Sequence, residues 1–218
     1  MNTPIGVRLF LVSIAILTAY CGQIKQVTEK KTPEQNKEES TLSQLKVNDS
    51  PNCKNKKYYR EHWKHWVDEN GDCHDTRQEV LISRSVQSVS YKEGGCKVEK
   101  GKWTDPYDAE EFTQPSELDI DHMVPLKNAH ESGGCDWDSE KKKGYANFLG
   151  NSYHLMPVKS SENRSKSDKS PDQWKPSNKD YYCTYAKNWI SIKKDWGLSI
   201  TNKEKTALED MLSECKAQ

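Results

Sequence analysis

The stretch Asp119-Ile120-Asp121-His122-Met123-Val124-Pro125-Leu126 decides the predicted fold. Apolar residues alternate with polar ones here until Pro125, which has no backbone N–H for a strand ladder, so we predict a strand that stops there. A second apolar run at residues 154–158 predicts another strand, and Ser160 after it is suited to cap a helical turn that carries Asn163. Strands and helices together predict an α+β domain.

Two further helices are predicted near the C-terminus. Residues 180–196 carry an aromatic and aliphatic stripe that stops at Gly197, and Thr201 with Glu204 form a capping box before a second stripe. Upstream, we predict helical spacing over residues 58–67, a helix or a strand over residues 76–89, and a short hairpin around Gly101.

The neighbouring Asp121 and His122 pose a geometric problem. Adjacent residues of a regular strand point to opposite faces, so these two side chains could not serve one ion within an unbroken pleat. We therefore expect their site where the strand ends. Asp119 shares the strand face of Asp121, where it either orients that carboxylate or is simply solvated.

Residues 119–126, 154–158 and 163–166 together offer the groups that phosphodiester hydrolysis needs. The reaction needs a base to activate water, a cation to neutralise charge, and donors that hold the phosphate. An Asp-His pair alone is more often structural than catalytic, so the case depends on the wider pattern.

That wider pattern resembles the HNH, or ββα-metal, nucleases, and within them the branch typified by the C-terminal domain of the GmrSD restriction endonucleases. The resemblance spans about residues 66–215. Its motifs are Asp72 to Leu81, Cys96 with Val98, Gly101 and Trp103, Asp119 to Leu126, Tyr145-Ala146-Asn147, Asn163 to Lys166, Trp174 with Pro176, Tyr182-Cys183 with Tyr185-Ala186, and Met211-Leu212 before Cys215. So many short motifs in order are specific where one is weak. The resemblance implies a ββα-metal core with flanking helices.

The resemblance also implies a role for each residue of the site. It makes His122 the general base, Asp121 a metal ligand, and Asn163 a ligand of the same metal from the helix. Lys166 lies three residues after Asn163 and on a helix shares its face, so we expect it to bind phosphate, with Arg164 as a weaker candidate. The cofactor is a single divalent metal ion, Mg²⁺ first, with Mn²⁺ or Zn²⁺ as alternatives. The implied products carry 5′-phosphate and 3′-hydroxyl ends.

His154 departs from the commonest pattern of these nucleases. It stands where the middle Asn of the HNH signature is usual, so we expect it either to brace the loop that bears the catalytic His or to act as an extra ligand. Asn147 and Asn151 are the alternatives if the register differs. The remaining histidines are interpreted as ordinary surface or interior residues: His62, His65, His74 and His130.

The charge of the chain gives little support for a polyanionic ligand as a whole. Lys and Arg total 33, as do Asp and Glu, so the net charge is zero. Residues 159–194 hold nine Lys or Arg against four acids, a local excess that fits either a nucleic-acid surface or a solvated helix face. The expected partner is DNA, with RNA as an alternative.

The N-terminus predicts export. Arg8 precedes a twelve-residue apolar run, residues 9–20, which has the length of a signal-peptide core and is too short to span a bilayer. The segment ending at Cys21 resembles a bacterial lipobox, although Tyr20 is a poor fit, so ordinary cleavage remains the alternative. We interpret residues 1–21 as signal peptide or lipobox, 22–52 as a disordered tether, and 53–218 as the folded domain.

Six cysteines remain when Cys21 is set aside, an even number in a chain expected to reach an oxidising compartment. Three disulfides follow as a hypothesis, and the sequence allows fifteen pairings. The shared motifs favour two pairs, and two cysteines are left over. The preferred pairing is Cys73 with Cys96, Cys183 with Cys215, and Cys53 with Cys135.

The sequence thus predicts a metal-dependent endonuclease that hydrolyses phosphodiester bonds, with DNA preferred, outside the cytoplasm. It would be lipid-anchored to the cell envelope or secreted, would touch a membrane only through a lipid anchor, and shows no obligate protein partner. The alternative is a surface lipoprotein that keeps the scaffold as a binding module without turnover. The intact set of Asp121, His122 and Asn163 argues against that alternative.

Overall fold

The computed structural model describes residues 33–50, 53 and 55–215. The predicted signal segment 1–21 with Cys21, and residues 22–32 of the predicted tether, lie outside the described residues. No helix within the described ranges is long and apolar enough to cross a lipid bilayer.

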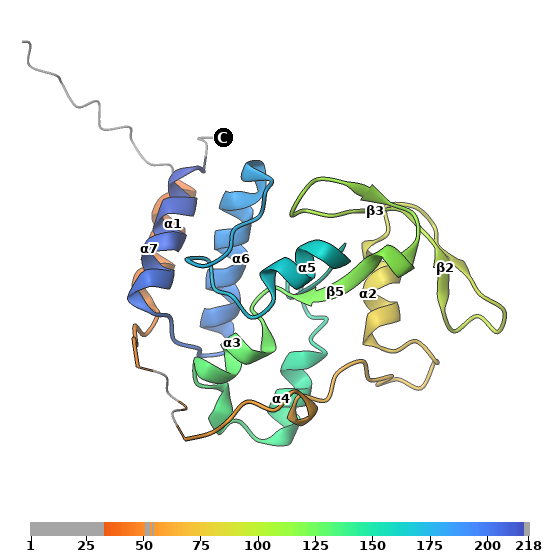
Figure 1. Ribbon diagram of the computed structural model, residues 1–218, viewed down its shortest axis with the longest axis horizontal. Helices are drawn as coiled ribbons and strands as arrows, with labels where there is room; N and C mark the ends of the chain where they lie inside the picture. The colour runs from red at the N-terminus through yellow and green to blue at the C-terminus, as the bar shows by residue number, and fades with distance from the viewer. Residues whose placement is uncertain (1–32, 51–52, 54, 216–218) are drawn as a thin grey trace, which may run out of the picture. The chain divides into compact units, whose positions relative to one another are not determined.

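A pair of strands followed by a helix lies at the centre of the described fold (Figure 1). Strand β5 (Leu118–His122) pairs antiparallel with β6 (Leu155–Lys159), so that Leu118 lies opposite Lys159 and His122 opposite Leu155. Helix α5 (Ser160–Lys166) follows β6 directly and packs against both strands. The predicted strands, the helix after them and the α+β class are confirmed, and β5 ends at His122, before Pro125.

Short strands and one helix flank this central pair. Helix α2 (Thr76–Arg84) begins after Asp75, whose carboxylate accepts from the Gln78 N–H. Strands β1 (Ser90–Tyr91) and β2 (Val98–Lys100) form one hairpin, and β3 (Trp103–Thr104) and β4 (Glu111–Phe112) form another. The hairpin predicted around Gly101 is therefore wrong. The cause is Trp103, whose buried indole donates to the Leu81 carbonyl and turns its strand towards α2.

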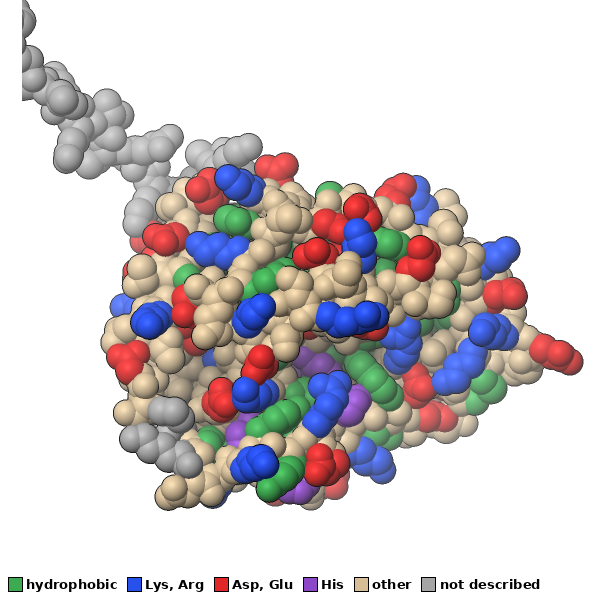
Figure 2. Space-filling model, in the orientation of Figure 1, with side chains coloured by type: hydrophobic (Ala, Val, Ile, Leu, Met, Phe, Trp, Pro, Cys, Tyr) green, Lys and Arg blue, Asp and Glu red, His purple; other side chains and the backbone are tan. Residues whose placement is uncertain are grey.

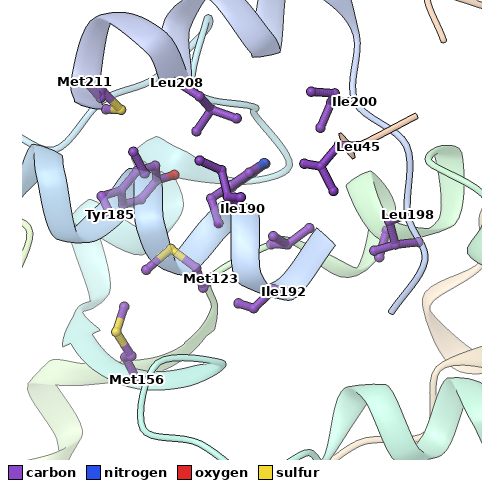
Figure 3. Close-up of a cluster of buried hydrophobic side chains, with 14 of the residues drawn as sticks. Leu45, Met123, Met156, Tyr185, Ile190, Ile192, Leu198, Ile200, Leu208 and Met211 are labelled. Atoms are coloured by element: carbon purple, nitrogen blue, oxygen red, sulfur yellow. The ribbon is translucent and has the colours of Figure 1, made fainter. Parts of the chain in front are cut away.

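Two helices from the C-terminal part of the chain form one side of the core. Helices α6 (Tyr182–Asp195) and α7 (Asn202–Ser213) pack on each other, and α7 has the predicted capping box of Thr201 and Glu204. Gly197 follows α6 with a positive φ of 66°, as expected for the position after a helix C-cap. Figure 3 shows the aliphatic and sulfur-containing side chains that these helices bury with Met123 of the β5–α3 connection.

Helix α1 (Pro33–Gln44) belongs to the same layer and corrects the predicted tether. It packs against α6 and α7, and Figure 1 shows it beside α7. Leu42 and Leu45 are buried in the core, and the Asn48 N–H donates to the Ile200 carbonyl. Two leucines three residues apart give this polar segment one apolar edge, which is enough to dock it. The folded region therefore includes residues 33–50, and a domain boundary at Cys53 is wrong.

Short helices and turns complete the chain. They are α3 (Leu126–Glu131), α4 (Ser139–Ala146) and the 3-10 turns Arg60–His62, Pro115–Glu117, Gly134–Asp136 and Lys179–Tyr181. The helix predicted over residues 58–67 is reduced to one of these turns. Trp63 is fully buried there, and Trp66 has a positive φ of 58°, which a helix cannot accommodate.

The predicted disulfide pairing is confirmed. Cys53 is bonded to Cys135, Cys73 to Cys96, and Cys183 to Cys215. The first bond ties the chain before Trp63 to the turn after α3, and the last joins α6 to the residue beyond α7. Each bond restricts the unfolded chain and so stabilises the fold.

Candidate functional site

The end of β5 opens into a cavity of about 420 Å³, called here the strand-end cavity. Its lining includes Asp121 and His122 from β5, Asn163 and Arg164 from α5, and Tyr58 and Arg60 from the chain before α2. Figure 2 shows histidine side chains in a recess beside α5, with Lys and Arg side chains at its edges. The residues predicted from the sequence as base, ligands and weaker phosphate contact thus share one cavity.

Asp121 and His122 keep the alternation of a strand, as the pleat requires. Asp121 makes its contacts with α5 and Tyr107, whereas His122 contacts Trp66 and the end of α4. Both side chains reach the strand-end cavity because His122 is the last residue of β5. The expected break of the pleat therefore lies just after this pair.

Asp121 is buried and held by two donors. The Tyr107 hydroxyl donates to Oδ2 at 2.6 Å, and the Lys166 ammonium lies 3.0 Å from Oδ1 and 2.9 Å from Oδ2. Burial raises the pKa of the Asp121 carboxyl, and the positive charge of Lys166 opposes that shift. The ion pair and the phenol hydrogen bond stabilise the carboxylate form in an apolar setting.

Lys166 differs from its predicted role. Its ammonium is fully buried, donates to the His122 carbonyl at 3.0 Å as well as to Asp121, and does not line the strand-end cavity. Burial lowers the pKa of this lysine, while the Asp121 charge opposes the shift. Lys166 therefore holds the end of β5 in place through these interior contacts. Of the two predicted phosphate contacts, Arg164 is the one that lines the cavity.

Asp119 orients Asn163. Its Oδ2 accepts from the Asn163 amide nitrogen at 3.1 Å, and its Oδ1 accepts from the Ser160 hydroxyl at 3.1 Å. Asp119 is thus neither simply solvated nor bonded to Asp121, and Ser160 does not cap its own helix. Because the Asn163 nitrogen faces Asp119, its carbonyl oxygen is the atom left to bind a cation. No hydrogen bond to that oxygen is made within the described ranges.

His122 has a defined tautomer. Its Nε2 lies 2.9 Å from the Ala146 carbonyl, which can only accept, so Nε2 carries the proton and Nδ1 holds the free lone pair. No described protein group hydrogen-bonds to Nδ1. Burial lowers the pKa of His122 well below its usual value, so the ring is neutral at pH 7. A neutral imidazole with one basic nitrogen available is the form that a general base requires.

Aromatic rings and a bracing asparagine hold His122 in place. The Trp66 ring stacks on the imidazole, with centroids 5.8 Å apart and planes 25° apart. Asn147 fixes the chain around Trp66, because its Oδ1 accepts from the Val67 N–H and its Nδ2 donates to the Lys64 carbonyl. Trp66 adopts its left-handed conformation within this network.

His154 lies behind the cavity rather than in its lining. Its Nε2 donates to the Tyr145 carbonyl at 2.9 Å, and its own carbonyl accepts from the Met123 N–H. Burial lowers the pKa of His154 to about 4. Of the two expected roles, the contacts agree with bracing and give no support to a role as extra ligand. The alternatives also brace: Asn147 as above, and Asn151 through the N–H groups of Tyr153 and His154.

Several residues of the site were not singled out from the sequence. Tyr107 is one, and it is positioned by Asp105, which accepts from the N–H groups of Tyr107 and Lys159. Burial raises the pKa of Asp105 to about 6. Tyr107 lies 14 residues before Asp121, and no motif or spacing in the sequence indicates that the two side chains are partners. Arg60 is another, and its place in the basic aromatic run of residues 56–66 was a usable signal.

The possible cation ligands are two oxygens. Within the described part of the chain no cluster of three or more His, Cys, Asp or Glu side chains could hold a metal ion. Asp121 Oδ1 accepts one hydrogen bond, from Lys166, so one of its two acceptor sites is left. The Asn163 carbonyl oxygen has both of its acceptor sites left.

Comparisons with known proteins identify the family of the chain. The model of the family described as GmrSD restriction endonucleases, C-terminal domain, matches residues 75–211. A protein of Arthroderma benhamiae, named "Uncharacterized secreted protein", is 36% identical over 206 residues, which cover 94% of this chain and 98% of that protein. No solved structure matches the chain. The predicted resemblance is confirmed, and the chain belongs to the family of GmrSD restriction endonuclease C-terminal domains.

Proposed function

We propose that this protein is a nuclease of the HNH type that hydrolyses phosphodiester bonds, with His122 as the general base. One observation carries the proposal: Nε2 of His122 is committed to the Ala146 carbonyl, which leaves Nδ1 as a basic nitrogen beside a cavity shared with Asp121, Asn163 and Arg164. Among the described residues, Nδ1 of His130 and Nδ1 of His154 also lack a hydrogen-bond partner, but both of these atoms are buried and neither ring lines the cavity.

Each polar residue in or beside the cavity has its own role in the proposed hydrolysis. His122 Nδ1 takes a proton from the attacking water, and the Ala146 carbonyl keeps the ring in that tautomer as positive charge develops on it. Arg164 is exposed and has no acidic partner in the described residues, so its guanidinium is free to bind a phosphate in bidentate fashion. Lys166 and Tyr107 hold the Asp121 carboxylate in its charged form.

The donor set fits a hard divalent cation with few protein ligands. Asp121 Oδ1 and the Asn163 carbonyl oxygen are oxygen donors, and Asp119 fixes the amide so that oxygen rather than nitrogen is offered. Mg²⁺ prefers oxygen ligands and retains several waters, so two protein ligands suffice; Mn²⁺ and Zn²⁺ are the alternatives. A cation held there would neutralise charge on the phosphate and on the departing 3′ oxygen.

We further propose DNA as the preferred substrate, with RNA as the alternative, and a location outside the cytoplasm. The three disulfides are typical of proteins that fold in an oxidising compartment, and the relative from Arthroderma benhamiae carries "secreted" in its name. Lipid anchoring through Cys21 stays a prediction from the sequence.

Nicking of supercoiled plasmid tests this proposal. The purified protein should nick the plasmid with Mg²⁺ or Mn²⁺ and stop when a chelator is added. His122→Ala should abolish nicking. Because this change removes a buried ring and the donor to the Ala146 carbonyl, it should also lower the melting temperature, so nicking is compared at a temperature where circular dichroism shows the variant folded. The control His74→Ala, outside the cavity, should cut like the wild type. Nicking that persists in His122→Ala would refute the assigned base. Retained DNA binding with no cleavage under any metal would instead favour the non-catalytic binding module.

A further inference from the structure

The strand-end cavity has one wall that the family match does not include. Residues 56–65, called here the basic segment, precede the matched residues 75–211 and contain four Lys or Arg and one acid. Tyr58 and Arg60 of this segment line the cavity beside His122 and Arg164. Arginines therefore reach the cavity from two parts of the chain, α5 and the basic segment.

The basic segment is anchored at both ends. Cys53, just before it, is bonded to Cys135, and the His130 ring donates from Nε2 to the Lys56 carbonyl at 2.7 Å. Near its other end Trp63 is fully buried and packs edge-on against Tyr145. The backbone of a segment held in this way keeps a fixed position relative to β5.

The Arg60 guanidinium lies beside the His65 ring. The Trp63 carbonyl lies 2.8 Å from His65 Nδ1 and can only accept, so Nδ1 carries the proton and Nε2 of His65 is an acceptor. Arg60 Nη2 lies 3.5 Å from that Nε2. The interaction is weak, and it uses one of the five N–H donors of the guanidinium. Arg60 has no acidic partner in the described ranges.

We propose that Arg60 binds a phosphate of the nucleic-acid substrate in the strand-end cavity, together with Arg164. Two guanidiniums without carboxylate partners lie in one cavity, and a phosphodiester is the anion that the proposed reaction brings there. The inference rests on the proposed nuclease function for the identity of the anion. Lys127, the other cation of the lining, is engaged with Asp168 and Glu131 and is not available in the same way.

Binding of a fluorescently labelled DNA duplex, followed by anisotropy in the presence of a chelator, tests the inference without turnover. Arg60→Met should weaken binding about tenfold at moderate salt, because a charge-assisted contact to phosphate is lost. The slope of log Kd against log salt concentration should fall by about one, the value expected for one phosphate contact. Arg60→Lys should keep the slope and still bind several-fold more weakly, because an ammonium lacks the planar fork.

Lys64→Met is the matched control, since it removes one exposed positive charge from the same segment but not from the cavity lining. It should change the affinity by less than about twofold. Arg60→Met binding like the wild type, or no more weakly than Lys64→Met, would overturn the inference, as would a wild-type protein that binds no DNA. Cleavage with an unchanged KM in Arg60→Met would also overturn it and leave the nuclease proposal intact. DNA binding that depends on Arg60, in a protein that cleaves no DNA with any metal, would support the phosphate site and contradict the nuclease proposal.

Discussion

Replacing Lys166 with Met distinguishes between two roles for this lysine. One is the buried ion pair with Asp121, and the other is the phosphate contact predicted from the sequence. The ammonium has no exposed surface and contacts both Asp121 oxygens and the His122 carbonyl within 3.0 Å. Met has a similar length, so the change removes the charge with little loss of volume. Asp121 would keep only the Tyr107 hydroxyl as donor, and the His122 carbonyl would lose its lysine donor. Breaking one side of a buried pair costs about 3–5 kcal/mol of unfolding free energy.

Urea denaturation followed by tryptophan fluorescence would measure this loss directly. For a domain of this size the same loss lowers the melting temperature by roughly 6–20 °C. Lys169→Met is the matched control: Lys169 is exposed and lies just beyond α5, and its ammonium donates to the Ser165 carbonyl. Its unfolding free energy should stay within about 0.5 kcal/mol of the wild type.

A double variant would test the pairing itself. Asp121→Asn combined with Lys166→Met should be less destabilised than the sum of the single variants, because neither charge is then left unpaired. The reasoning fails if Lys166→Met unfolds within about 0.5 kcal/mol of the wild type and instead weakens DNA binding with a smaller salt slope. That outcome would support the predicted contact between Lys166 and a substrate phosphate.

Two other predictions follow from the groups that brace the site. Burial lowers the pKa of His154 to about 4, below its value of about 6.5 in an unfolded chain, so the unfolded state binds more protons and stability falls as the pH drops below about 6.5. Between pH 7 and pH 5 the wild type should lose about 2 kcal/mol more unfolding free energy than His154→Asn, measured by urea titration at each pH, and parallel losses would show that this ring does not titrate as a buried group. Asn147→Ala removes the bonds to Val67 and Lys64 on either side of Trp66, so kcat for cleavage of a labelled oligonucleotide should fall about tenfold or more with KM unchanged. A higher KM at an unchanged kcat would contradict this positioning role.

The sequence predicts elements well where the signal is local. Three predictions depend on only a few neighbouring residues, and each is confirmed: the capping box of Thr201 and Glu204, the glycine after α6 and the apolar run of β6. The errors arise where a distant partner decides. Trp103 turns away from the predicted hairpin because its indole bonds to a carbonyl of α2, and α1 forms because α6 and α7 offer an apolar surface to Leu42.

The same distinction explains the site. Helical spacing correctly places Asn163 and Lys166 on one face of α5, and both contact carboxylates of β5, Asp119 and Asp121 respectively. Spacing alone does not show what covers that face. The strand covers it, so the lysine becomes an interior partner of Asp121. Arg164, one residue off the face, is the cation that reaches the cavity. The motif therefore predicts which residues lie close together. Whether a side chain can bind substrate or instead holds another residue in place depends on how deeply it is buried.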